Sequence, residues 1–139
     1  MKVFVSLRMN GRSDAEIIED QKKALKILEN DLKERGELDS PLELIDTVHH
    51  TFIPNNPQRL HYLGASIQKL ADADFVFFYD DWYKAKGCWV ELLAASLYKK
   101  KAVYDYPDSF IGGFTHSVIT EISYFIEQAN RKEEEKKND

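Results

Sequence analysis

One carboxylate of this sequence stands where a catalytic acid could work. Glu91 belongs to the segment 84–95, which reads as a loop that turns into a helix just after the apolar segment 75–79. If 75–79 is a strand, Glu91 lies in the first turns of a helix at the carboxyl edge of a parallel sheet, where open α/β sheets bind ligands. Such a group could act as an acid, as a nucleophile or as a sugar-binding group. The alternative is an exposed glutamate that complements the helix dipole.

An aromatic and acidic cluster is expected at the same edge. Tyr79, Asp80, Asp81 and Trp82 end the third strand, and Gly87 follows them. Aromatic rings offer faces on which a base could stack, an aspartate could bind sugar hydroxyls or protonate a leaving group, and Gly87 would permit a ligand close to the backbone. The alternative is a solvated acidic loop in which Trp82 packs on a helix.

The loop after the first strand has the composition of an anion site. Its polar or glycine positions include Ser6, Arg8, Asn10, Gly11 and Arg12. Helix amides and the positive end of the helix dipole favour an anion there, and the two arginines could hold a phosphate. The alternative is a capped helix with solvated arginines. The loop is neither a P-loop nor a dinucleotide fingerprint, because the required glycine spacing and lysine are absent.

Cys88, His49 and His50 are weaker candidates. A helix N-terminus can lower the pKa of a thiol, but no histidine lies near Cys88 in sequence and a lone cysteine is usually a packing residue. The two histidines would need further ligands to hold a metal, and the sequence does not place any. We therefore expect no metal site and no organic cofactor.

Alternating strands and helices must position these groups. Strands are predicted at 2–7, 42–48, 75–79 and 101–104. Helices are predicted from a Ser13 cap to a stop at Gly36, from the pair Asn56-Pro57 to about 70, from the Glu91 segment to about 100, and around 118–126 after Gly112-Gly113. The alternation indicates βαβ crossovers in a single flavodoxin-like or Rossmann-like three-layer α/β sandwich. Its parallel sheet would have four to five strands, with helices on both faces.

Length and composition restrict the class of protein. The 139 residues suffice for one domain, expected at 1–129, and 130–139 form a charged tail that is either a frayed helix end or disordered. With a net charge of −5, a broad nucleic-acid surface is not expected. No apolar stretch approaches the length that spans a bilayer, and no secretion signal is recognisable. One cysteine fits a reducing compartment, so we expect a cytoplasmic protein without membrane partners.

Taken together, these residues resemble the nucleoside 2-deoxyribosyltransferase-like superfamily. The closer likeness is to a branch of small bacterial and phage proteins related to the 2'-deoxynucleoside 5'-phosphate N-hydrolases. The likeness covers roughly residues 1–105, and the order and spacing of its motifs carry it. The motifs are Ser6-Leu7-Arg8-Met9-Asn10-Gly11, Tyr62-Leu63-Gly64, Ala73-Asp74 and the Trp82…Gly87…Glu91 block.

The resemblance implies a flavodoxin-like sheet and a glutamate, here Glu91, that attacks the anomeric carbon of a 2-deoxyribosyl group. It implies a homo-oligomer, a dimer or larger, in which a neighbour helps to close the pocket. In the related hydrolases the first loop binds the 5'-phosphate, a role that would fall on five residues here: Ser6, Arg8, Asn10, Gly11 and Arg12. The expected partner is a small nucleoside or nucleotide.

Two departures leave the function open. The transferases carry an acid six residues before the glutamate, where this chain has Ala85, and an aspartate of the hydrolases falls on Ser66. Asp80 or Asp81 would have to help the base leave. The main alternative is therefore a binding protein for a nucleotide or nucleotide signal that has lost turnover. A receiver-like or flavin-binding module fits less well, because the first strand lacks paired acids and a hydroxyl-rich loop.

Overall fold

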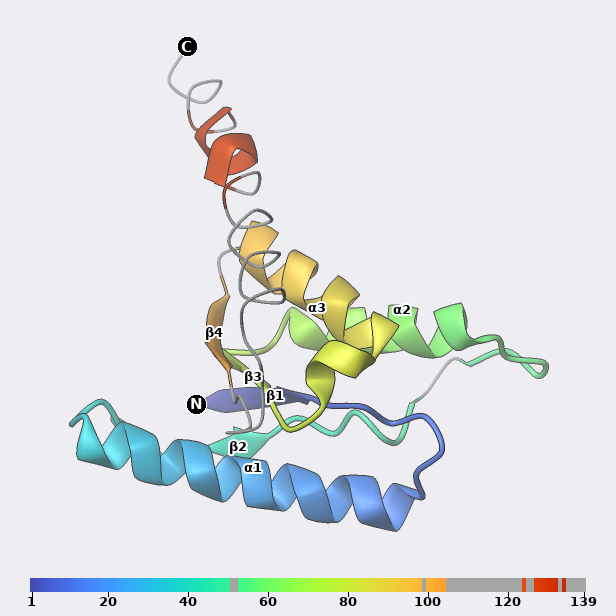
Figure 1. Ribbon diagram of the computed structural model, residues 1–139, viewed down its shortest axis with the longest axis horizontal. Helices are drawn as coiled ribbons and strands as arrows, with labels where there is room; N and C mark the ends of the chain where they lie inside the picture. The colour runs from blue at the N-terminus through green and yellow to red at the C-terminus, as the bar shows by residue number, and fades with distance from the viewer. Residues whose placement is uncertain (51–52, 99, 105–123, 125–126, 133, 135–139) are drawn as a thin grey trace.

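The computed structural model describes residues 1–50, 53–98, 100–104, 124, 127–132 and 134. Strands and helices alternate in this part of the chain, in a mixed α/β fold with a parallel sheet (Figure 1). The elements are β1 (Lys2–Ser6), α1 (Asp14–Glu34), β2 (Glu43–Leu44), α2 (Arg59–Leu70), β3 (Phe75–Phe78), the short 3-10 helix η1 (Trp82–Lys84), α3 (Lys86–Leu97) and β4 (Lys101–Tyr104). The pair Gly112-Gly113 and, apart from Tyr124, the predicted helix around 118–126 lie outside the described residues.

The described sheet has the strand order β2-β1-β3-β4, and each neighbouring pair is parallel. β1 and β3 therefore lie side by side in its centre, with Ser6 opposite Phe78 at their carboxyl ends. β2 is much shorter than the predicted segment 42–48. The Asp46 carboxylate accepts the backbone N–H groups of Val48 and His49, and this local turn competes with further pairing to β1.

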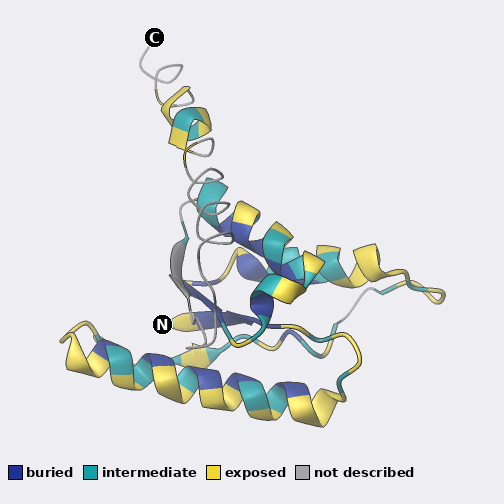
Figure 2. Ribbon diagram, in the orientation of Figure 1, coloured by how far each residue is buried: buried dark blue, intermediate teal, exposed yellow. Residues whose placement is uncertain are grey.

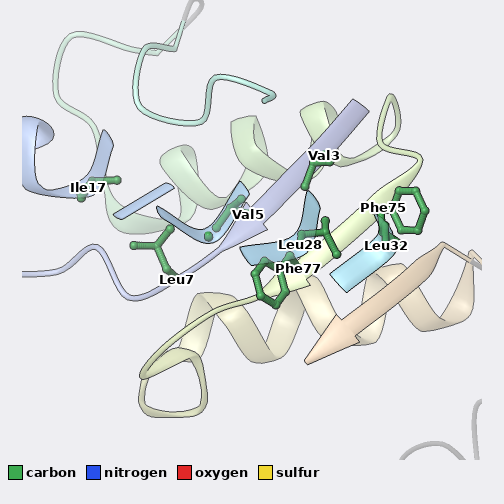
Figure 3. Close-up of a cluster of buried hydrophobic side chains, with 9 residues drawn as sticks. Val3, Val5, Leu7, Ile17, Leu28, Leu32, Phe75 and Phe77 are labelled. Atoms are coloured by element: carbon green, nitrogen blue, oxygen red, sulfur yellow. The ribbon is translucent and has the colours of Figure 1, made fainter. Parts of the chain in front are cut away.

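Buried residues lie along the central strands and on the helices packed against them (Figure 2), and they form two apolar clusters, one on each face of the sheet. Because side chains alternate along a strand, Val3, Val5 and Leu7 of the first strand segment face α1. Figure 3 shows these residues packed against Ile17, Leu28 and Leu32 of α1 and against Phe75 and Phe77 of β3. The opposite face, with Phe4, Val76 and Phe78, is covered by α2, η1 and α3. Helices thus cover both faces of the described sheet.

The ends of α1 agree with the sequence, whereas the start of α2 does not. Ser13 accepts the Glu16 N–H at 3.2 Å, as a capping serine should. At the other end Gly36 adopts φ +69, and the Glu37 N–H reaches the Leu32 carbonyl, the arrangement of a Schellman motif. α2 begins at Arg59 and not at Pro57, because the backbone N–H of Gln58 is bound by His61 Nδ1 at 2.8 Å.

The helices that follow β1 and β3 lie on opposite faces of the sheet. The chain leaves β1 toward α1 on one face and leaves β3 toward α3 on the other. Such a reversal between neighbouring parallel strands is where open α/β sheets bind their ligands.

None of the helices among the described residues is long and apolar enough to cross a membrane.

Candidate functional site

Glu91 lies in the layer between α3 and the sheet. It is the sixth residue of α3, within the first two turns as predicted, and its exposed fraction is 9%. The helix carries the apolar residues Leu92 and Ala95 on its buried side. The alternative of an exposed glutamate that only complements the helix dipole is therefore wrong. Burial of a carboxyl group is costly, so its position needs another explanation.

Ser6 is the polar group that β1 brings to Glu91. It is 1% exposed and lies on the same face as Phe4, with its carbonyl accepting the Tyr79 N–H at 2.9 Å. Its hydroxyl lies close enough to interact with both Cys88 and Glu91. Nevertheless, within the described part of the chain, Ser6 Oγ and Glu91 Oε2 are buried atoms that complete no hydrogen bond of good geometry. Two buried polar atoms with unused capacity thus meet at the end of β1.

The ionisation of Glu91 is shifted by this environment. Burial disfavours the carboxylate and raises its pKa, the Ser6 hydroxyl acts in the opposite direction, and the resulting pKa is about 7. Near neutral pH the group therefore exists in both forms. Its anion is a nucleophile and its acid is a proton donor, so this one side chain could serve in either role.

Cys88 does not have the properties of a nucleophile. Its side chain is buried, and burial together with the nearby Glu91 raises the pKa of the thiol to about 12. A thiol that stays protonated is inert toward electrophiles. Cys88 is a packing residue beside Glu91, as its lone occurrence in the sequence suggested.

Charged groups from two loops meet above this edge. Arg8, after β1, lies 3.8 Å from the Asp81 carboxylate, and Lys84 of η1 lies 3.7 Å from the same oxygen. These contacts tie the loop after β1 to the segment that leads into α3. The loop after β1 and the segment that leads into α3 therefore lie at the same edge of the sheet.

The other residues of the first loop are arranged for structure. Arg12 forms an ion pair with Asp20 of α1 and donates to the Arg8 carbonyl at 3.2 Å. Gly11 occupies the turn with φ +76, a conformation that favours glycine, and Asn10 beside it is exposed. Arg12 is therefore engaged with α1, while Arg8 keeps a side chain that is 45% exposed.

The prediction that Trp82 stacks on a base is wrong. Its exposed fraction is 0%, and its ring contacts Phe78, Tyr83 and Trp89 at centroid distances of 5.3, 5.9 and 5.2 Å. This core packing was the stated alternative. Tyr79 is partly buried and packs with the α1 layer, 5.7 Å from Phe77 between centroids. The two rings predicted as alternative stacking faces thus belong to different apolar layers.

Gly87 lies inside α3 and not in the loop before it. A Cβ atom at this position would lie 3.6 Å from Leu63 Cδ1, an ordinary contact. The protein's own packing therefore does not require glycine here, and the predicted close approach of a ligand stays a prediction.

Asp80 has an unusual backbone. It is exposed at the end of β3 with φ +56, a left-handed conformation that aspartate tolerates and β-branched residues avoid. We expect Asp80→Asn to unfold at the same urea concentration as the wild type, and Asp80→Val to lose about 1–2 kcal/mol of unfolding free energy. Equal stability of the two variants would show that the backbone carries no strain at this position.

The loop after β2 is held by structural contacts. Lys69 of α2 donates to the Asp46 and His49 carbonyls at 2.5 and 2.6 Å. Partial burial tends to raise the pKa of Asp46, but the amides of His49 and Val48 and the His49 ring lower it to about 2. His50 lies beside Tyr62, with ring centroids 6.2 Å apart. Among the described residues, no group of three or more His, Cys, Asp or Glu side chains is placed to hold a metal ion.

Sequence reasoning missed two features of this edge. It assigned Ser6 to phosphate, although the strict alternation of Val3, Phe4, Val5 and Ser6 already places the serine with Phe4 on the face that α3 covers. It also left out Lys84, whose spacing of three residues from Asp81 permits their contact.

Comparison of the chain with protein-family models, with curated proteins and with solved structures returned no match.

Proposed function

We propose that this protein cleaves the N-glycosidic bond of deoxynucleosides or their 5'-monophosphates, by hydrolysis or by transfer to a second base. The observation that carries the proposal is the buried Glu91, held beside the carboxyl ends of β1 and β3 with its Oε2 atom lacking a hydrogen bond among the described residues. Buried carboxyl groups with raised pKa values cluster at functional sites. The resemblance to the 2-deoxyribosyltransferase-like proteins supplies the substrate class.

In the proposed reaction the Glu91 carboxylate attacks C1' of the deoxyribosyl group. A C–O bond forms, the C1'–N bond breaks, and its electron pair leaves with the base, which takes up a proton. Water, or the nitrogen of a second base, then attacks C1' and releases the carboxylate, while the attacking group gives up a proton. Asp80 or Asp81 would bind the sugar or assist the departing base, and no metal or organic cofactor takes part.

The test is the release of free base from a panel of deoxynucleosides and deoxynucleoside 5'-monophosphates, followed by chromatography. Addition of a second base distinguishes transfer from hydrolysis, because a new nucleoside appears only in transfer. Absence of turnover with every member of the panel at pH 6–8 would overturn the proposal.

A non-catalytic nucleotide-binding protein is the second candidate. Asp81, one of the two acids proposed to replace the missing one, lies within 4 Å of both Arg8 and Lys84, so its carboxylate already has two cationic partners. This observation favours binding without turnover. Calorimetry would then show heat with a nucleotide that is recovered intact, and no heat with any nucleotide would exclude this candidate.

Arg8 is the residue of the first loop that we propose as a phosphate ligand. Arg8→Ala should raise KM for 5'-monophosphates about tenfold or more and leave KM for nucleosides unchanged, because a charge-assisted hydrogen bond to phosphate is lost. Arg12→Ala is the matched control. It breaks the ion pair with Asp20 and should lower stability, without this difference between the two substrate classes.

The finer points of the architecture belong to the same proposal. The described strand order corresponds to the first four strands of the flavodoxin-like arrangement. We propose that the complete domain is a three-layer sandwich of this kind, that it acts as a homo-oligomer in the cytoplasm, and that its ligand is a small nucleoside or nucleotide.

A further inference from the structure

Ser6 is a buried serine whose hydroxyl lies close to the buried Glu91. The two residues come from different elements, β1 and α3, and both are nine-tenths buried or more. Ser6 is held rigidly, because it pairs with Phe78 within the sheet and its carbonyl binds the Tyr79 N–H. The Ser6 hydroxyl therefore lies in the layer beneath α3, close enough to interact with Cys88 and Glu91.

We infer that Ser6 is a positioning residue for Glu91. The Ser6 hydroxyl donates to the buried Glu91 carboxylate and orients it at the carboxyl edge of the sheet. In the structure, Ser6 Oγ and Glu91 Oε2 are buried atoms that complete no hydrogen bond among the described residues, so each keeps the capacity to bond the other when the carboxyl group ionises. A serine hydroxyl stabilises the anion more than the acid, which accepts more weakly. This inference rests on the proposed function only for its kinetic consequences.

The inference departs from the role that the resemblance gave Ser6. A phosphate is strongly hydrated and needs a ligand at the surface, whereas Ser6 is 1% exposed. Arg8, two residues later, is exposed and remains available for that purpose. The loop therefore divides into a buried part, which acts on Glu91, and an exposed part, which can meet an anion.

The titratable side chains near α3 are engaged elsewhere or stay uncharged, so none of those named here takes the place of Ser6. Cys88, one turn earlier on the same helix, stays uncharged because its pKa is raised to about 12. Arg8, Asp81 and Lys84 from the β1 and β3 loops lie close to one another, within 4 Å. On α2, which packs against α3, His61 is bound to the Gln58 N–H and Lys69 to two carbonyls. Tyr62 of the same helix is exposed and lies beside His50.

The test is a carbon-13 NMR titration of the Glu91 carboxyl resonance, identified by its absence in Glu91→Gln. The wild-type midpoint should lie near pH 7. Ser6→Ala should raise the midpoint by about one pH unit, the effect of one hydrogen bond to a charged group, and Ser6→Thr should restore it. Ser66→Ala is the matched control, because Ser66 is a buried serine of α2 that is not among the groups acting on the Glu91 pKa.

An unchanged midpoint in Ser6→Ala would overturn the inference. Ser6→Ala removes one oxygen atom and is expected to fold, which thermal melting checks, so the comparison with Ser66→Ala stands even if the larger Ser6→Thr does not fold. If base release is detected, Ser6→Ala should shift the acid limb of the pH profile of kcat to higher pH. It should leave KM unchanged for nucleosides and for monophosphates. A selective rise in KM for monophosphates would instead assign Ser6 to phosphate. If base release is absent, the proposed function fails, and the titration still decides the role of Ser6.

Discussion

Replacement of Glu91 by glutamine should abolish base release, with a loss in kcat of at least about a thousandfold. Glutamine keeps the shape of the side chain but has no anionic oxygen to attack C1', and removal of a nucleophile typically costs this much or more. The measurement is chromatographic base release at pH 8, where the wild-type carboxyl group with its pKa of about 7 is mostly ionised. Binding of the nucleotide, measured by calorimetry, should survive.

Glu43→Gln provides the control for charge. Glu43 is an exposed glutamate of β2, so its replacement changes the net charge equally without touching the buried layer. It should retain wild-type rates. Equal rates in the wild type and Glu91→Gln would remove Glu91 from the mechanism, whereas turnover in neither protein would favour the binding candidate.

The same substitution should remove a loss of stability that the wild type suffers as the pH rises. The pKa of Glu91 is raised from 4.5 in the unfolded chain to about 7 in the folded protein, so the folded state binds more protons between these values. Stability therefore falls as the pH rises from about 4.5 to 7, and the loss is complete above that range. A shift of this size corresponds to about 3 kcal/mol. Glu91→Gln lacks this titration, so its unfolding free energy relative to that of the wild type should rise by about this amount between pH 4.5 and 8.

Urea denaturation of both proteins between pH 4.5 and 8.5 measures this difference. Groups such as Asp46, which titrate in both proteins, cancel in the comparison. Any fixed cost of burying the glutamine amide also cancels, because it does not vary with pH. Glu43→Gln should follow the wild-type curve. A constant difference between Glu91→Gln and the wild type across this range would show that Glu91 is not buried with a raised pKa.

If both results hold, Glu91 destabilises the protein at the pH where it is most active as a nucleophile. Such opposition between stability and activity is common at functional sites, where a group is kept in an environment that disfavours it. Ser6 would then reduce this cost by stabilising the anion, and the burial of Ser6 and Glu91 near each other would have a common physical reason.

The parts of the fold that the sequence predicted depend on local patterns. The apolar first strand, the Ser13 cap and the Gly36 stop reflect the composition and interactions of residues close in the chain, so they can be read without the tertiary structure. The start of α2 and the short β2 could not be predicted in this way. They depend on His61 binding the Gln58 amide and on Asp46 capturing two N–H groups, which compete with the general preferences of Pro57 and of apolar strands.

For the candidate site, the sequence alone determined that Glu91 follows a central apolar strand near a helix start, and that polar residues follow the first strand. Only the tertiary structure decided which of these groups lie in one buried layer. It placed Ser6 beneath α3, paired Arg12 with Asp20, and enclosed Trp82 among three aromatic rings. The reason is that burial and pKa depend on contacts between β1, β3 and α3, which lie far apart in the chain, and no local pattern records those contacts.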